Sequence, residues 1–193
     1  MSTFNSKIKD RSGQIGIIGL GYVGIPLCIR LAEVEFQVLG FDIDEKLVDE
    51  LTDGKSSIKH ISDSSIKRMR SEGFKATTDF SLINNCDVLV ICVPTPLDKS
   101  REPDLSYVIA TMNQIQPHLR SHQLLCLEST TWPGTTEEIL APLVIEAGFN
   151  PGEDFYLAYS PEREDPGNPN FSTQTIPKVV GGLTEKCLEH AEY

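Results

Sequence analysis

The sequence predicts an α/β fold in which a doubly wound parallel sheet carries helices on both faces. Short apolar segments alternate with longer segments of helical periodicity along most of the chain, as in proteins built from repeated strand–helix units. The apolar segments contain few polar residues, which is typical of parallel strands covered by helices on both sides. A glycine-rich turn joins the first of these strands to the first helix.

This turn carries the strongest functional signal. Residues 15–18 predict a buried strand and residues 22–34 a helix, with glycines between them in the spacing G-x-G-x-x-G. Gly19 permits a tight turn, Gly21 leaves the backbone open to a pyrophosphate, and Gly24 lets the helix pack close to the strand. Free N–H groups at the start of the helix attract an anion. Glycines also mark ordinary turns, but the order of strand, turn and helix predicts a Rossmann-like dinucleotide-binding domain.

An acidic residue at the end of the second strand supports this prediction. Residues 36–41 predict that strand, and Asp42 follows it, 18 residues after Gly24. An acid near this spacing bonds the adenosine ribose hydroxyls and repels a 2′-phosphate, so NAD is favoured over NADP. The alternative is that Asp42 only caps the helix predicted to begin near Asp44.

The remaining elements are placed by the same periodicity and by capping and turn residues. Helices are predicted at residues 44–51, 62–73, 104–112 and 135–147 and from residue 184 onward, and strands at residues 74–77, 86–93, 123–127, 155–159 and 178–181. Residues 1–14 are polar and are expected to form a flexible N-terminal arm. Residues 15–193 are then expected to form one NAD-binding Rossmann domain.

Composition excludes several other classes of protein. The 193 residues carry a net charge of −11 without a dense cluster of Lys and Arg, so no nucleic-acid partner is predicted. No apolar run reaches the roughly 20 residues of a membrane span, and the polar N-terminus does not resemble a signal peptide. The five cysteines form no C-x-x-C pair and the four histidines stand apart, which predicts buried thiols in the cytoplasm and no metal site.

Candidate site residues follow the predicted strands, because ligands of such sheets bind beyond the carboxyl ends of the strands. Thr95 lies in a Pro-Thr-Pro turn, Thr130 follows another strand, and Glu162 precedes Arg163 after a third. The threonines can offer hydroxyls and amides to the nicotinamide half of a cofactor. Glu162 can act as an acid or base, and Arg163 can bind an anion. The alternatives are that the threonines are turn residues and that Glu162 and Arg163 form a surface ion pair.

Four motifs together resemble the N-terminal domain of the UDP-glucose/GDP-mannose dehydrogenase family. They are Gly19-Leu20-Gly21-Tyr22-Val23-Gly24, Val93-Pro94-Thr95-Pro96, Glu128-Ser129-Thr130 and Ser160-Pro161-Glu162-Arg163. They span almost the whole chain after residue 14. Residues 101–107, 128–134 and 160–168 look most like the UDP-N-acetylglucosamine 6-dehydrogenase branch, which makes UDP-N-acetylglucosaminuronic acid for bacterial surface polysaccharides.

The resemblance implies an activity and a cofactor. The family oxidises the 6-hydroxymethyl group of a nucleotide sugar to a carboxylate with two NAD. By resemblance, Tyr22, Val23 and Asp42 hold the adenosine and pyrophosphate together with the glycine turn. Thr95 and Thr130 are expected nearer the nicotinamide.

The resemblance also implies catalytic and substrate contacts. Thr130 is similar to a threonine that positions a catalytic water, and Glu162 to a glutamate that activates water for thioester hydrolysis. Arg163 and Glu164 are similar to a pair that contacts the UDP-sugar substrate. Lys46 is placed near the ribose from its position alone.

One departure from the family pattern matters for activity. Family members carry a catalytic cysteine in a Gly-Phe-Gly-Gly-x-Cys motif of a C-terminal domain, and this sequence has no such motif. We therefore expect a truncated protein that holds the cofactor domain without the central helix and the UDP-binding domain. It is expected to bind NAD but not to complete turnover. The full-length protein is expected to be a homodimer or larger.

Three alternatives accompany this interpretation. The substrate can instead be UDP-N-acetylmannosamine or UDP-glucose, because most sugar contacts are expected outside this chain. A non-catalytic NAD(H)-sensing module is a second alternative, but it has no need for water-activating groups such as Thr130 and Glu162. A methyltransferase with its own glycine turn does not explain polar residues at successive strand ends.

Overall fold

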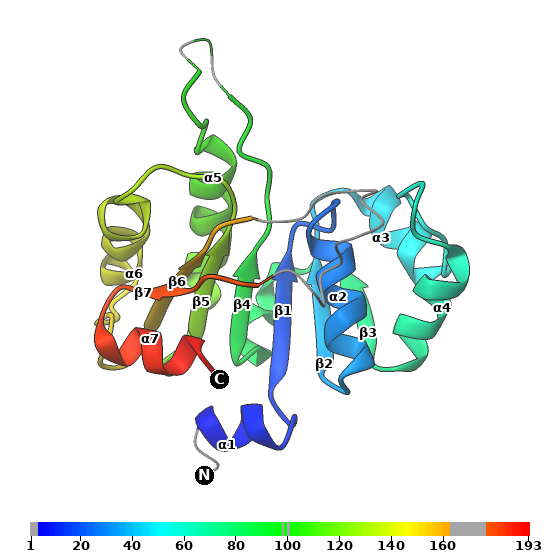
Figure 1. The fold of residues 1–193 in the computed structure, drawn as a ribbon, viewed down its shortest axis with the longest axis horizontal. Coiled ribbons are helices and arrows are strands. Elements are labelled where there is room, and N and C mark those ends of the chain that lie inside the picture. Colours follow the sequence, from blue (N-terminus) through cyan, green and yellow to red (C-terminus); the bar gives the residue numbers. More distant parts are fainter. Residues whose placement is uncertain (1–3, 98, 100, 163–176) are drawn as a thin grey trace.

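The computed structural model describes residues 4–97, 99, 101–162 and 177–193. In this part of the chain seven strands form one sheet in the order β3-β2-β1-β4-β5-β6-β7 (Figure 1). The strands are β1 (Gln14–Ile18), β2 (Gln37–Phe41), β3 (Phe74–Thr77), β4 (Val88–Ile91), β5 (Leu124–Glu128), β6 (Tyr156–Ser160) and β7 (Gly181–Gly182). The sheet confirms the predicted doubly wound fold, and its strand order reverses between β1 and β4.

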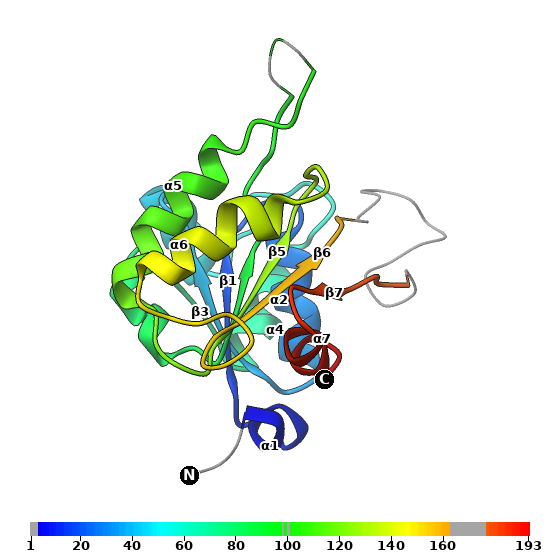
Figure 2. The ribbon, with the colours of Figure 1, turned by 90° about the vertical axis from the view of Figure 1, so that its left-hand side faces the viewer.

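Helices cover both faces of the sheet, as predicted. The helices are α1 (Phe4–Lys9), α2 (Gly24–Glu33), α3 (Glu45–Thr52), α4 (Asp63–Ser71), α5 (Ser106–Ile115), α6 (Ala141–Glu146) and α7 (Glu185–Ala191). In Figure 2 the sheet is seen nearly edge-on, with α5 and α6 on one side and α2, α4 and α7 on the other. The helices therefore shield both faces of the central strands from water, which explains why these strands are apolar.

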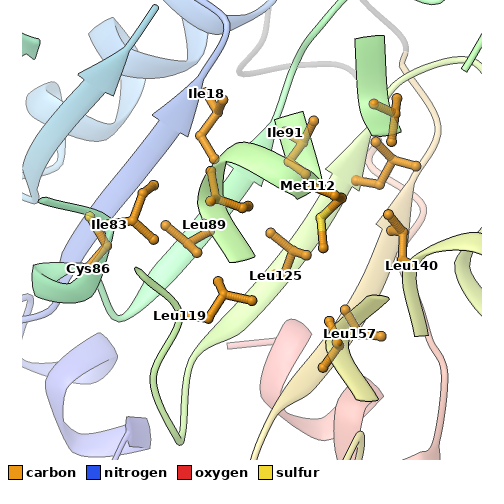
Figure 3. Packing of buried hydrophobic residues seen from close by; sticks show 14 of the residues in the cluster. Ile18, Ile83, Cys86, Leu89, Ile91, Met112, Leu119, Leu125, Leu140 and Leu157 are labelled. Carbon is orange, nitrogen blue, oxygen red and sulfur yellow. The ribbon is translucent and has the colours of Figure 1, made fainter. Parts of the chain in front are cut away.

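Alternation along the strands assigns each side chain to one of the two faces. Leu89 and Ile91 of β4 join the buried cluster under α5 and α6, whereas Val90 and Cys92 join the cluster under α2 and α4. Figure 3 shows the first cluster, in which Met112 of α5 lies over the strands. The two clusters fix the register of β4 because a shift by one residue would exchange its faces.

The N-terminal residues differ from the predicted flexible arm. Residues 4–9 form helix α1, and Lys7 Nζ lies 2.7 Å from Asp87 Oδ1. The Phe4 ring lies 6.2 Å from that of Tyr156, and Ile8 packs against the cluster under α2. Two apolar side chains and one ion pair therefore attach a segment that was expected, from its polar composition, to be a loose arm.

Two other segments also differ from the sequence prediction. The last strand was predicted at residues 178–181 of a parallel sheet, but β7 is Gly181–Gly182 and runs antiparallel to β6. The helix predicted at 135–147 begins with a π-helical turn, Thr136–Leu140, before α6. Three short non-α segments complete the description: the 3₁₀ helices η1 (Phe80–Asn85) and η2 (Gln116–His118), and that π turn, η3. No described helix is long and apolar enough to cross a bilayer.

Candidate functional site

A cavity of about 590 Å³ opens at the carboxyl ends of the central strands, where the strand order reverses. This is the position at which doubly wound sheets bind their ligands. The cavity is lined by Gly19, Gly21, Tyr22 and Val23 after β1, Asp42 and Ile43 after β2, Val93, Pro94 and Thr95 after β4, Glu128, Ser129 and Thr130 at the end of β5, Glu162 after β6, and Tyr107, Ala110, Thr111 and Gln114 from α5. The chain thus brings together candidate residues from five separate segments.

The three glycines of the turn have different structural roles. Gly19 has a φ of +96°, and a Cβ atom there would lie 2.9 Å from the carbonyl oxygen of Cys92. A Cβ atom on Gly24 would overlap the carbonyl oxygen of Gly19. Gly21 has no atom within 4 Å of the position of a Cβ, although it borders the cavity. Packing therefore requires Gly19 and Gly24, whereas the open space at Gly21 fits the close approach of a phosphate group.

Helix α2 begins at the same turn. Its N-cap residue, Val23, makes no side-chain capping hydrogen bond. Ile25 N donates to the carbonyl oxygen of Gly21 at 3.1 Å, and Pro26, the third residue of the helix, has no N–H. An anion at this turn is therefore favoured mainly by the positive end of the helix dipole.

Asp42 joins the end of β2 to the glycine turn. Its Oδ2 accepts a hydrogen bond of 2.8 Å from Leu20 N, and its Oδ1 accepts one of 3.0 Å from Asp44 N. The cap of α3 is Asp44, which accepts from Lys46 N and Leu47 N, so the alternative that Asp42 caps this helix is wrong. Each oxygen of Asp42 keeps lone pairs for a hydroxyl donor in the cavity.

Lys46 lies beside the main cavity rather than in its wall. It lines a neighbouring hollow of about 260 Å³ together with Tyr22 and Asp44. Its Nζ atom is 3.8 Å from Glu50 Oε1. The predicted contact of Lys46 with a ribose stays a prediction.

The predicted nicotinamide side of the cavity is held by hydrogen bonds between strand ends. Ser129 Oγ donates to the carbonyl oxygen of Val93 at 2.9 Å, and Tyr159 OH donates to that of Ser129 at 3.1 Å. These bonds fix the segments that carry Thr95 and Thr130 relative to each other. Sequence reasoning quoted Ser129 in a motif but gave it no role, because its partner is 36 residues away.

Glu128 and Lys178 form an ion pair at the same end of the cavity. The Glu128 side chain is 6% exposed and that of Lys178 is 37% exposed. Burial lowers the pKa of Lys178 below its ordinary value. Sequence reasoning missed this pair, although a glutamate at the end of an apolar strand requires a partner when it is buried.

Glu162 lines the cavity and is half-buried. Arg163 and Glu164, the predicted substrate-contacting pair, lie outside the described residues. Within the described residues no group of three or more His, Cys, Asp and Glu side chains can hold a metal ion.

Two cysteines near the cavity are poor nucleophiles. Burial raises the pKa of Cys126 to about 11, and burial raises the pKa of Cys92 well above its ordinary value. Both thiols are therefore protonated near neutral pH, and a protonated thiol is unreactive. Neither of them was assigned a catalytic role from the sequence, because neither lies in a glycine-rich turn.

Comparison with known proteins identifies relatives of the chain. Residues 13–193 match the sequence profile of the UDP-glucose/GDP-mannose dehydrogenase family, NAD binding domain. The UDP-N-acetyl-D-glucosamine 6-dehydrogenase of Pseudomonas aeruginosa is 33% identical over 177 residues, which is 91% of this chain and 41% of that protein. The UDP-N-acetyl-D-mannosamine dehydrogenase of Salmonella typhi is 35% identical over 189 residues, 92% of this chain and 44% of that protein. The chain thus spans less than half the length of these relatives.

Solved structures agree with these matches. The native structure of the UDP-N-acetyl-mannosamine dehydrogenase from Staphylococcus aureus superposes with a TM-score of 0.84 at 32% identity, covering 93% of this chain and 44% of that one. The GDP-mannose dehydrogenase from Pseudomonas aeruginosa gives a TM-score of 0.81 at 28% identity, covering 92% and 43%.

Proposed function

The chain belongs to the UDP-glucose/GDP-mannose dehydrogenase family as an NAD-binding domain, and we propose that it serves a nucleotide-sugar 6-dehydrogenase. The proposed reaction oxidises UDP-N-acetylglucosamine to UDP-N-acetylglucosaminuronic acid, for bacterial surface polysaccharides. The observation that carries the proposal is that Gly21, Asp42, Thr95 and Thr130 line one and the same cavity. Its volume of about 590 Å³ falls in the range of small-molecule and cofactor sites.

The residues present fit NAD in one orientation. The pyrophosphate would lie over Gly21 and the start of α2, where there is open space and the positive end of the helix dipole favours an anion. The adenosine lies on the β2 side, with its ribose hydroxyls on Asp42 and its base beside Tyr22 and Val23. The nicotinamide then lies on the β4–β5 side, between Thr95 and Thr130, because a dinucleotide spans the point where the strand order reverses.

Each side chain on the nicotinamide side has a proposed role. Bound NAD supplies the hydride acceptor of the reaction. Thr130 positions a water, and Glu162, half-buried in the same wall, takes a proton from it. Arg163 and Glu164 contact the substrate. Ser129 keeps Thr130 in place through its hydrogen bond to Val93.

The relatives of this chain are named for more than one sugar. Relatives named for UDP-N-acetyl-D-glucosamine and for UDP-N-acetyl-D-mannosamine match at similar identities, 33% and 35%. UDP-N-acetylmannosamine is therefore an alternative substrate, and UDP-glucose is another because most sugar contacts are expected outside this chain. Comparing the turnover of the three UDP-sugars by the whole protein decides between them. We also propose that the full-length enzyme forms a homodimer or a larger assembly and that it acts in the cytoplasm.

The experiment that tests the cofactor site is a titration of the chain with NADH and NADPH, followed by cofactor fluorescence. Saturable binding of NADH is expected, with NADPH binding at least about tenfold more weakly because Asp42 repels a 2′-phosphate. Equal binding of the two cofactors would contradict the position given to Asp42. Absence of any binding would contradict the proposed site.

A further inference from the structure

The Glu128–Lys178 ion pair lies where the proposed function puts the nicotinamide. Glu128 ends β5 and borders the cavity directly before Ser129 and Thr130. Lys178 approaches from the segment before β7, and β6 separates β7 from β5 in the sheet. The pair therefore links the end of a central strand to the chain at the sheet edge, 50 residues further along the sequence.

Stability alone is a weak explanation for this pair. Glu128 is almost fully buried, and taking a carboxylate out of water costs free energy that its partner repays only in part. Well-packed apolar side chains at such positions are often as stable. The position of Glu128 in the cavity wall, with Lys178 bonded to it, points instead to a role toward the ligand.

The charge of the nicotinamide ring differs between the two forms of the cofactor, so a charged side chain near the ring can distinguish them. The ring carries one positive charge in NAD⁺ and none in NADH, whereas the rest of the cofactor is the same. A charge near the ring therefore acts on the two forms differently, and a compensated pair acts on both nearly alike. The buried thiols of Cys92 and Cys126 are protonated and add no charge. Glu162 shares the cavity and stays the same in every variant below.

We propose that Lys178 neutralises Glu128 beside the nicotinamide and thereby sets the balance of affinity between NAD⁺ and NADH. This inference rests on the proposed function, because it takes the nicotinamide to lie at the β5 end of the cavity. Without Lys178, the carboxylate favours the cationic ring of NAD⁺. Without Glu128, the ammonium group disfavours it. The pair thus avoids trapping either the oxidised substrate form or the reduced product form of the cofactor.

The test measures the dissociation constants of NAD⁺ and NADH for the chain at pH 8 by calorimetry. In Glu128→Gln the ratio Kd(NAD⁺)/Kd(NADH) is expected to rise by about threefold or more, because Lys178 is left uncompensated. In Lys178→Met the ratio is expected to fall by about threefold or more. The double variant is expected to return to within about twofold of the original ratio.

A purely structural role gives a different result, because loss of the pair would then weaken both cofactors equally and leave the ratio unchanged. That outcome overturns the inference and leaves the proposed function intact. An original chain that binds neither cofactor overturns both. Should Lys178→Met fail to fold by circular dichroism, the nearly isosteric Glu128→Gln still decides, since only a rise in the ratio supports the inference.

Asp87 provides a matched control. It is also a buried carboxylate paired with cations, Lys7 and Arg120, but it precedes β4 at the other end of the sheet. Asp87→Asn is expected to destabilise the chain without changing the NAD⁺/NADH ratio. A shift of the ratio in this variant as large as that in Glu128→Gln would overturn the inference.

Discussion

At the residue scale, packing requires some glycines of the turn, whereas Gly21 is expected to be required for cofactor binding. Gly21→Ala places a methyl group in open space, so the free energy of unfolding is expected to stay within about 0.5 kcal/mol of the original. The same methyl group would narrow the proposed approach of the pyrophosphate, so the dissociation constant for NADH is expected to rise by about tenfold or more. Urea unfolding and NADH fluorescence measure the two quantities.

Gly24→Ala is the matched comparison for this variant. Its methyl group would overlap the carbonyl oxygen of Gly19, so we expect a loss of about 2 kcal/mol in the free energy of unfolding. If Gly21→Ala destabilised the chain as strongly as Gly24→Ala, the assignment of open space to Gly21 would be incorrect.

A second prediction at this scale concerns the selectivity for NADH over NADPH. Asp42→Asn removes the charge that we propose bonds the ribose and repels a 2′-phosphate. The dissociation constant for NADH is expected to rise about tenfold, with a smaller change for NADPH, so the preference narrows. Asp44→Asn removes a charge two residues away and keeps a good helix cap. It is expected to change the preference by less than about twofold, and a larger effect would point away from Asp42.

At the scale of the elements, one charged group ties three segments together at the amino ends of the strands. Asp87, directly before β4, accepts hydrogen bonds of 2.7 Å from Lys7 in α1 and 2.7 Å from Arg120. It also accepts one of 3.2 Å from the backbone N–H of Gln14 in β1. Asp87→Asn is expected to lower the free energy of unfolding by about 2–4 kcal/mol. Lys55→Met, which breaks an exposed ion pair with Asp53, is the control and should leave stability unchanged within error.

The same group predicts a pH dependence of stability. Burial alone would raise the pKa of Asp87, but the hydrogen bonds from Lys7, Arg120 and the backbone of Gln14, together with the charge of Lys7, outweigh burial and hold this pKa below its ordinary value. Such a carboxylate contributes its full stabilisation above its unfolded pKa of about 4, and the contribution is lost as the pH falls through the folded pKa. Unfolding measured between pH 7 and pH 3 should therefore depend less on pH in Asp87→Asn. Equal slopes in both proteins would exclude Asp87 as a source of the acid sensitivity.

The predicted and unpredicted elements differ in the range of the interactions that form them. The sequence pattern predicted β4 and its neighbours because these strands are buried under helices on both faces of the sheet and are therefore apolar. It did not predict α1, whose attachment depends on Asp87, 80 residues from Lys7. It also missed the direction of β7, since a strand of two glycines has no side chains to carry a pattern.

The site follows the same division. The glycine turn and Asp42 were found from local sequence, and Gly19, Gly21 and Asp42 lie in the cavity wall. The bonds from Ser129 to Val93 and from Lys178 to Glu128 span 36 and 50 residues. A single sequence gives no sign of which distant residue completes such a pair, so these contacts needed the structure.

At the scale of the whole molecule, the Asp87 ion-pair cluster and the proposed cofactor cavity lie at opposite ends of the strands. The cavity lies at the carboxyl ends of the strands, whereas the Asp87 cluster lies at their amino ends. A ligand that binds only the folded chain stabilises it by about 2.7 kcal/mol at 100 times its dissociation constant. For a chain of this size that corresponds to a rise of roughly 5–10 °C in Tm. Saturating NADH is therefore expected to raise the Tm measured by scanning calorimetry.

Asp87→Asn and Gly21→Ala are expected to change this Tm measurement in different ways. At one fixed concentration of NADH, Asp87→Asn is expected to start from a lower Tm and to gain nearly the same increase, because its cavity is unchanged. Gly21→Ala is expected to start from the original Tm and to gain several degrees less, because its affinity is lower. A reduced increase in Asp87→Asn would show that the amino end of the sheet influences the cavity through the strands. If the change in stability and the change in NADH binding prove independent, the fold tolerates substitutions at the amino ends of the strands without loss of binding at their carboxyl ends.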